Sequence, residues 1–110
     1  LHGVTVGENC LIGMNAVLMD EVLLEKECIV GALAFVKAKS TFESRSLIVG
    51  NPAKKIKTIS DEMIHWKTKG TRLYQQLPKE CYESLEICEP LRTIDENRPK
   101  HSKNYQIWEK

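Results

Sequence analysis

The sequence predicts a mainly β fold, a parallel coil of short strands that is followed by an amphipathic α-helix and a polar tail. Large apolar residues recur at every sixth position from Val6 to Ile48, and a small or β-branched residue recurs two places before each of them. After Pro52 the period of six stops, and apolar residues recur at helical spacing instead. The change of period divides the chain into a repeat region and a helical region.

The period of six sets the architecture expected for residues 1–50. The large apolar positions are Val6, Ile12, Leu18, Leu24, Val30, Val36, Phe42 and Ile48, and the small positions are Val4, Cys10, Ala16, Val22, Cys28, Ala34, Ser40 and Ser46. Three hexads form one three-sided turn, so equivalent positions stack on strands about 4.8 Å apart. We expect the large residues to line the interior and the small ones to lie where the chain turns tightly.

Three glycines follow apolar positions of the repeat, namely Gly7, Gly13 and Gly31. We expect them to adopt corner conformations that are closed to residues with a Cβ. The repeat supplies fewer than three coils, and one coil cannot bury its own faces. The segment therefore needs preceding coils, a partner chain, or both.

The remainder of the chain divides into three segments. Residues 51–59 form an exit turn and a basic connector, which is interpreted as a solvated strand rather than a phosphate site. Residues 60–90 form a helical segment with Ser60 as N-cap and acidic residues in the first turn, and Pro78 is expected to kink it. Residues 91–110 are polar and aperiodic and are expected to be a mobile tail.

Composition indicates a soluble globular chain. It has 110 residues, 42% hydrophobic and 28% charged, with a formal net charge of +1. This balance predicts no nucleic-acid partner, and no apolar run is long enough for a membrane span. The repeat is already running at Val4 and the first residue is Leu1, so we expect the chain to be the C-terminal part of a longer protein.

The four cysteines lack zinc-finger spacing, and reduced thiols in the cytoplasm are the expectation. Cys10 and Cys28 lie one coil apart and should stack. Their Cβ bonds would point the same way, which is poor disulfide geometry. We therefore expect two packed thiols.

Several motifs together resemble one protein family. They are Leu1-His2-Gly3, Ile12-Gly13-Met14-Asn15-Ala16-Val17, Gly50-Asn51-Pro52-Ala53-Lys54 and Glu96-Asn97-Arg98-Pro99. The chain resembles the γ-carbonic-anhydrase-like branch of the hexapeptide-repeat proteins, and most of all its phenylacetic acid degradation and carnitine operon members. The resemblance covers nearly the whole chain. It implies a left-handed parallel β-helix, since parallel crossovers are otherwise right-handed.

The resemblance also implies a metal site. Members form homotrimers through the β-helix faces, and three histidines at each subunit boundary hold zinc or another divalent metal. His2 matches the second histidine of a pattern in which two histidines lie five residues apart, and the other two ligands would lie upstream of residue 1. Asn15 and Tyr74 are candidates for lining the pocket, and no residue is assigned to another cofactor.

The implied activity is hydration of CO2 or hydrolysis of acyl-CoA thioesters, in phenylacetate or carnitine metabolism, by a metal-bound hydroxide. The partner is then a small-molecule substrate. With one histidine of three, the chain alone is expected neither to hold a metal tightly nor to be active.

Two alternatives remain open at this point. One is a hexapeptide-repeat acyltransferase in which a histidine acts as general base. The Leu1-His2-Gly3 context and the lack of a protruding loop between residues 4 and 48 argue against it. The other is a non-catalytic trimeric scaffold or accessory protein. Histidines upstream of residue 1 would support the metalloenzyme.

Overall fold

A computed structural model describes residues 1–98 of the chain. It contains two compact units, Leu1–Lys69 and Gly70–Lys110, which are described separately. Residues 99–110, the end of the expected polar tail, lie outside the described residues.

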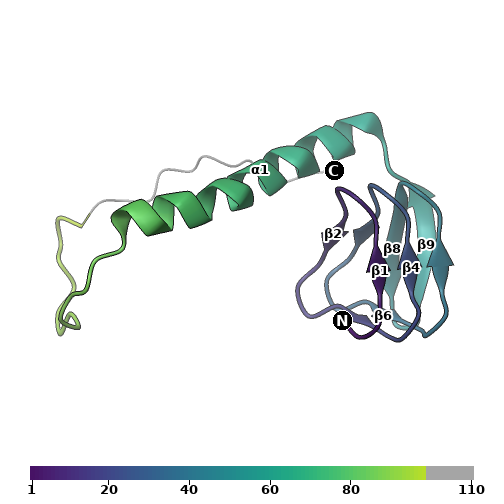
Figure 1. The fold of residues 1–110 in the computed structure, drawn as a ribbon, viewed down its shortest axis with the longest axis horizontal. Coiled ribbons are helices and arrows are strands. Elements are labelled where there is room, and N and C mark those ends of the chain that lie inside the picture. The colour runs from purple at the N-terminus through teal and green to yellow at the C-terminus, as the bar shows by residue number, and fades with distance from the viewer. Residues whose placement is uncertain (99–110) are drawn as a thin grey trace. The chain divides into compact units, whose positions relative to one another are not determined.

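The first unit contains three sheets of short strands, parallel except for the last strand β9, and the start of α1 (Figure 1). The first sheet contains β1 (Thr5–Val6), β4 (Leu23–Leu24) and β7 (Thr41–Phe42), the second contains β2 (Leu11–Ile12), β5 (Ile29–Val30), β8 (Ser46–Gly50) and β9 (Ala53–Thr58), and the third contains β3 (Val17–Leu18) and β6 (Phe35–Val36). The chain visits the three sheets in turn. Each return comes three hexads later, so that Val6 pairs with Leu24 and Leu24 pairs with Phe42.

The interior of this coil confirms the predicted stacking of large apolar residues. Leu18 pairs with Val36, and Ile12 pairs with Val30, which in turn pairs with Ile48. The buried cluster comprises Leu18, Val22, Leu24, Cys28, Val30, Ala34, Val36 and Ile48. Val6 and Ile12 belong to the first coil and are less buried than their partners in later coils, because among the described residues no coil covers them from the other side.

The small residues lie beside the tight turns, as expected, and their side chains face the core. Val22, Cys28, Ala34 and Ser46 are all buried. The turns are made by the residue that precedes each of them, in the left-handed region with φ between 53° and 61°: Asn9, Asn15, Glu21, Glu27, Leu33, Lys39 and Arg45. A left-handed corner directs the next side chain inward to where two faces of the coil converge, and only a small side chain fits there.

The predicted role of the glycines needs correction. Gly7, Gly13 and Gly31 are absent from the positions of positive φ, at which the glycines are Gly3 and Gly50. A Cβ on Gly7 would lie 2.6 Å from the carbonyl carbon of Glu25, in the next coil. These glycines are therefore needed because two coils approach closely, and backbone conformation is not the reason.

The exit from the coil is a β-hairpin. Strand β9 runs antiparallel to β8, so the basic residues of the expected connector lie in a strand. Helix α1 (Asp61–Ser84) follows, and Ser60 caps it, since the backbone N–H of Met63 donates to Ser60 Oγ at 3.3 Å. The helix contains Pro78 and ends at Ser84, before the end of the expected 60–90 segment.

One column of corner residues contacts the first turns of α1. Arg45 donates from Nε to Glu27 Oε2 at 2.8 Å and from Nη1 to Asp61 Oδ1 at 2.6 Å. Asn9, one coil before Glu27, donates from Nδ2 to Thr68 Oγ1 at 3.0 Å. The column formed by residues 9, 27 and 45 thus fixes where the helix begins.

The second unit begins within α1 and continues into an irregular segment. Its described side chains are almost all exposed, including Cys81 and Cys88. Asp95 organises a turn, because its carboxylate accepts from the backbone N–H of Asn97 at 2.9 Å. No helix among residues 1–98 has the length and apolar character that crossing a membrane requires.

Candidate functional site

The predicted metal ligand His2 lies just before β1 and stacks on the corner between β3 and β4 of the next coil. Gly3 takes a left-handed conformation with φ of 56°, and its carbonyl accepts from the backbone N–H of Glu21 at 2.9 Å. The backbone N–H of His2 donates to the carbonyl of Leu18 at 3.3 Å. Residues 2–3 are therefore attached to residues 18–21 of the next coil.

This attachment brings two side chains together. His2 Nδ1 contacts Asp20 Oδ1 one coil below it. The side chain of His2 is 81% exposed and that of Asp20 is 49% exposed. Nε2 of His2 makes no hydrogen bond to any residue that the structure describes, so this nitrogen is available to a ligand.

Asn15 lies at the opposite edge of the sheet formed by β3 and β6. It forms the corner before β3, with φ of 57°, and its side chain is exposed. His2 and Asn15 thus lie at opposite corners of the sheet formed by β3 and β6, and the structure does not bring them into one cluster. Tyr74 lies on α1 in the second unit and is 75% exposed.

Asp20 was not predicted as a site residue. Its signal was present, since Asp20 follows His2 by the 18 residues of one coil. The register of one coil applies to polar residues as well as to apolar residues and cysteines. Glu27 and Arg45 follow it too, since they are one coil apart and form an ion pair.

Cys10 and Cys28, which lie one coil apart, are two packed thiols, as expected. Cys10 and Cys28 are both free thiols. Cys10 Sγ donates to the carbonyl of Glu25 at 3.1 Å, and Cys28 Sγ donates to that of Glu43 at 3.2 Å. Burial raises the pKa of the Cys28 thiol, which disfavours the reactive thiolate.

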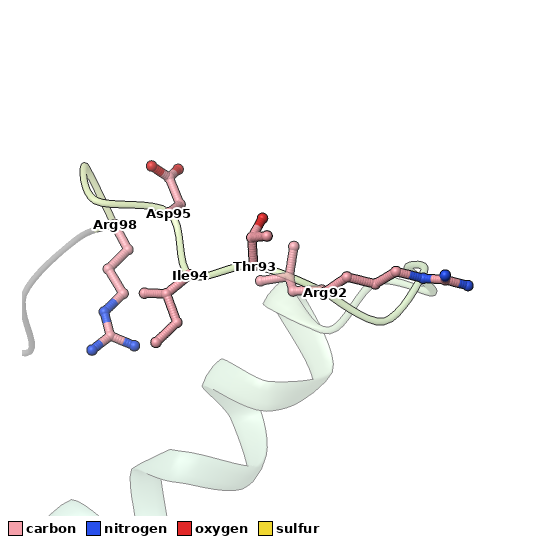
Figure 2. Close-up of a pocket in the computed structure, with 6 residues that line it drawn as sticks. Arg92, Thr93, Ile94, Asp95 and Arg98 are labelled. Carbon is pink, nitrogen blue, oxygen red and sulfur yellow. The ribbon is translucent and has the colours of Figure 1, made fainter.

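The second unit contains a shallow pocket of about 190 Å³. Figure 2 shows Ile94 and Arg98 on one side of the loop, Asp95 on the opposite side and Arg92 extending away from it. The side chains do not converge on a common point, and all the lining residues are exposed: Leu91, Arg92, Thr93, Ile94, Asp95 and Arg98. This pocket lacks the few convergent polar groups that characterise a binding site.

Comparison with known proteins agrees with the repeat. The family model for the bacterial transferase hexapeptide (six repeats) matches residues 3–38. The carnitine operon protein CaiE of Escherichia coli (strain K12) is 44% identical over 100 residues, which are 91% of this chain and 51% of that protein. Residues 3–38 of this chain thus match a hexapeptide repeat, and the chain as a whole is similar to CaiE. It spans about half the length of the curated relatives it matches.

Two solved structures share this fold. A hexapeptide transferase family protein from Anaplasma phagocytophilum superposes with a TM-score of 0.66 at 26% identity, over 70% of this chain and 46% of that one. A putative acetyltransferase from Bacillus cereus gives a TM-score of 0.71 at 23% identity, over 76% and 48% of the two chains. The second likeness is one of fold alone.

The donor chemistry of His2 suits a metal ligand. A neutral imidazole binds a metal through one nitrogen while the other donates to a carboxylate, and His2 has a carboxylate at Nδ1 and an exposed Nε2. Within residues 1–98, no group of three His, Cys, Asp or Glu side chains could hold a metal ion. His2 therefore has the donor chemistry of a single metal ligand, and the described residues do not complete a metal site around it.

Proposed function

We propose that this hexapeptide-repeat chain is the C-terminal part of a trimeric γ-carbonic-anhydrase-like metalloprotein that hydrates CO2 or hydrolyses acyl-CoA thioesters. The observation that carries the proposal is the exposed imidazole of His2, with Nδ1 against Asp20 and Nε2 accessible. His2 would supply one ligand to zinc or another divalent metal, and histidines outside this chain would supply two more. A metal held by three neutral imidazoles lowers the pKa of a bound water to near neutrality.

The exposed surface of the coil supports a trimer. Apolar side chains point outward on and between the second and third sheets: Leu11 (37% exposed), Met14 (81%), Val17 (47%) and Leu33 (72%). Exposed apolar patches of this kind are typical of interfaces between subunits. His2 and Asn15 flank the third sheet, so a neighbour packed on that sheet would come close to both. In this proposal Asn15 lines the pocket, and the coil is left-handed, as in the family that the chain resembles.

The test is metal analysis of the full-length protein that carries this chain. The wild type should purify with a divalent metal and hydrate CO2 or cleave an acyl-CoA thioester, and His2→Ala should lose both. His65→Ala is the matched control, because His65 is exposed on α1 and has no assigned role. Metal retained at full stoichiometry by His2→Ala would remove His2 from the ligand set.

The isolated chain gives a second test. One imidazole does not hold zinc tightly, so the 110-residue chain should lack both metal and activity. Robust activity of the isolated chain would contradict the proposal that two ligands come from outside it.

A hexapeptide-repeat acyltransferase is the second candidate. The match to the bacterial transferase hexapeptide model and the likeness to a hexapeptide transferase family protein favour it. In that case His2 would act as a general base through Nε2, and transfer of an acetyl group from acetyl-CoA would survive removal of metal with a chelator. Metal-free protein with no activity in either assay would instead favour the non-catalytic scaffold.

A further inference from the structure

Contacts with Gly3 and backbone hydrogen bonds restrain the position of Asp20 next to His2. A Cβ added to Gly3 would lie 3.4 Å from Asp20 Oδ1, so the carboxylate lies directly against this glycine. The backbone on both sides of Asp20 is fixed as well. Its carbonyl accepts from the N–H of Lys39 at 2.8 Å, and the N–H of Glu21 donates to Gly3 at 2.9 Å.

The chemistry of the contact determines which nitrogen of His2 carries a proton. A carboxylate only accepts hydrogen bonds, so the imidazole nitrogen that faces it must donate. Nδ1 of His2 faces Asp20. In the neutral ring the lone pair is then on Nε2, which points away from the carboxylate, and a metal ligand needs a lone pair on the nitrogen that coordinates.

We propose that Asp20 is a positioning residue that holds His2 in the tautomer protonated on Nδ1 and thereby presents Nε2 as the ligating atom. The part that concerns the metal rests on the proposed function, whereas the tautomer does not. Both side chains are substantially exposed, and an exposed pair of this kind contributes little to folding stability. The pairing therefore has its main effect on the orientation and protonation of the ring.

The tautomer can be measured without any metal. Long-range ¹H–¹⁵N correlation spectra of the ¹⁵N-labelled full-length protein, freed of metal with a chelator and held at a pH where the ring is neutral, report which nitrogen of each histidine is protonated. The signals of His2 are assigned by their loss in His2→Ala. We expect Nδ1 to be protonated in the wild type and Nε2 to become the main protonated nitrogen in Asp20→Ala, with thermal stability close to that of the wild type.

Two controls make the result specific. Glu21→Gln removes the adjacent carboxylate charge and should leave the tautomer unchanged. Asp20→Asn keeps an acceptor oxygen and the shape of the side chain, so it replaces Asp20→Ala if that variant does not fold, and it should shift the tautomer by a smaller amount. An Nε2-protonated wild type, an unchanged tautomer in both Asp20 variants, or an equal shift in Glu21→Gln would overturn the proposal.

A metal titration separates this inference from the proposed function. In the full-length protein, Asp20→Ala should weaken zinc binding by about 10- to 100-fold in chelator competition. If His2→Ala abolishes zinc binding and Asp20→Ala leaves both tautomer and affinity unchanged, the inference fails and the metal site stands. If Asp20→Ala reverses the tautomer and His2→Ala retains zinc, the tautomer assignment stands and the proposed function fails.

Discussion

The ammonium group of Lys67 donates a 2.6 Å hydrogen bond to the backbone carbonyl of Asn9 and a further one to Asn9 Oδ1. Lys67 is only 3% exposed, although lysine is rarely buried unless it is paired. Burial lowers the pKa of Lys67, since removal from water disfavours the charged form. A buried cation thus joins the start of α1 to the first coil.

Replacing Lys67 with Met should destabilise this unit by about 1–3 kcal/mol, because the two acceptor oxygens of Asn9 would lose their donor at a partly buried site. Met keeps most of the apolar stem of the side chain. Lys69→Met is the matched control, since Lys69 is exposed in the same turn and its replacement should change stability by less than about 0.5 kcal/mol. Urea denaturation followed by circular dichroism measures both. Equal stability of the two variants would mean that the buried contact adds nothing to folding.

Leu24 and Leu23 provide a direct test of the register of the coil. They are neighbours in β4, but Leu24 is fully buried whereas Leu23 is 38% exposed. Leu24→Ala should cost about 2–5 kcal/mol through lost burial and a residual cavity. Leu23→Ala should cost clearly less in the same denaturation assay. If the two losses were reversed, the inward and outward faces of the strand would be assigned wrongly.

Gly7→Ala should destabilise the coil by about 1–3 kcal/mol, because the added methyl group meets the backbone of Glu25 and Lys26 at 2.6 Å. The backbone cannot move aside as a flexible side chain could. Gly70→Ala, within α1, should act in the opposite direction and stabilise the chain by about 0.5–1 kcal/mol. The melting temperatures of both variants are compared with that of the wild type. A Gly7→Ala chain as stable as the wild type would show that the two coils do not approach each other closely at Gly7.

The Glu25 carboxylate should make stability depend on pH. Oε2 of Glu25 accepts from the backbone N–H and the hydroxyl of Ser44, both at 2.8 Å, and these hydrogen bonds hold the pKa of Glu25 below its ordinary value of 4.5. The folded chain therefore binds this proton less readily than the unfolded chain. The stabilisation is present above pH 4.5 and is lost as the pH falls through the lowered value.

Thermal melts between pH 7 and pH 3 check this dependence. Glu25→Gln should lower the melting temperature at neutral pH and should differ less from the wild type at the acid end. Glu8→Gln, at an exposed position of the neighbouring coil, should follow the wild-type curve. A constant difference between Glu25→Gln and the wild type across the range would exclude the titration as its cause.

The period of six was enough to predict the coil, because one simple rule, a large apolar residue facing inward in each hexad, holds from Val6 to Ile48. Corner conformations were not predictable by the same reasoning, since Leu33 and Arg45 rarely adopt positive φ and propensity alone argues against them there. The ladder of hydrogen bonds between adjacent corners supplies the reason. The N–H of Leu33, for example, donates to the carbonyl of Met14 at 3.0 Å.

The candidate site was predictable only in part. His2 was identified by resemblance, and its partner Asp20 emerges only when polar residues are also read at the spacing of one coil. Lys67 was hidden for a different reason, because it occupies the buried stripe of α1 with Met63 and Ile64, where a lysine is not expected. A buried lysine becomes reasonable once the acceptors of Asn9 are known to lie beneath it.

Every turn of the coil repeats the same corner conformation and the same inward-facing position, so all turns are geometrically equivalent. Inserting or deleting one complete turn would leave each remaining side chain facing the direction it faces now. A gap of a single residue would move the corner of every later hexad out of line with the corner beneath it. Length differences among natural homologues should therefore be whole turns of the coil, or loops inserted at a corner.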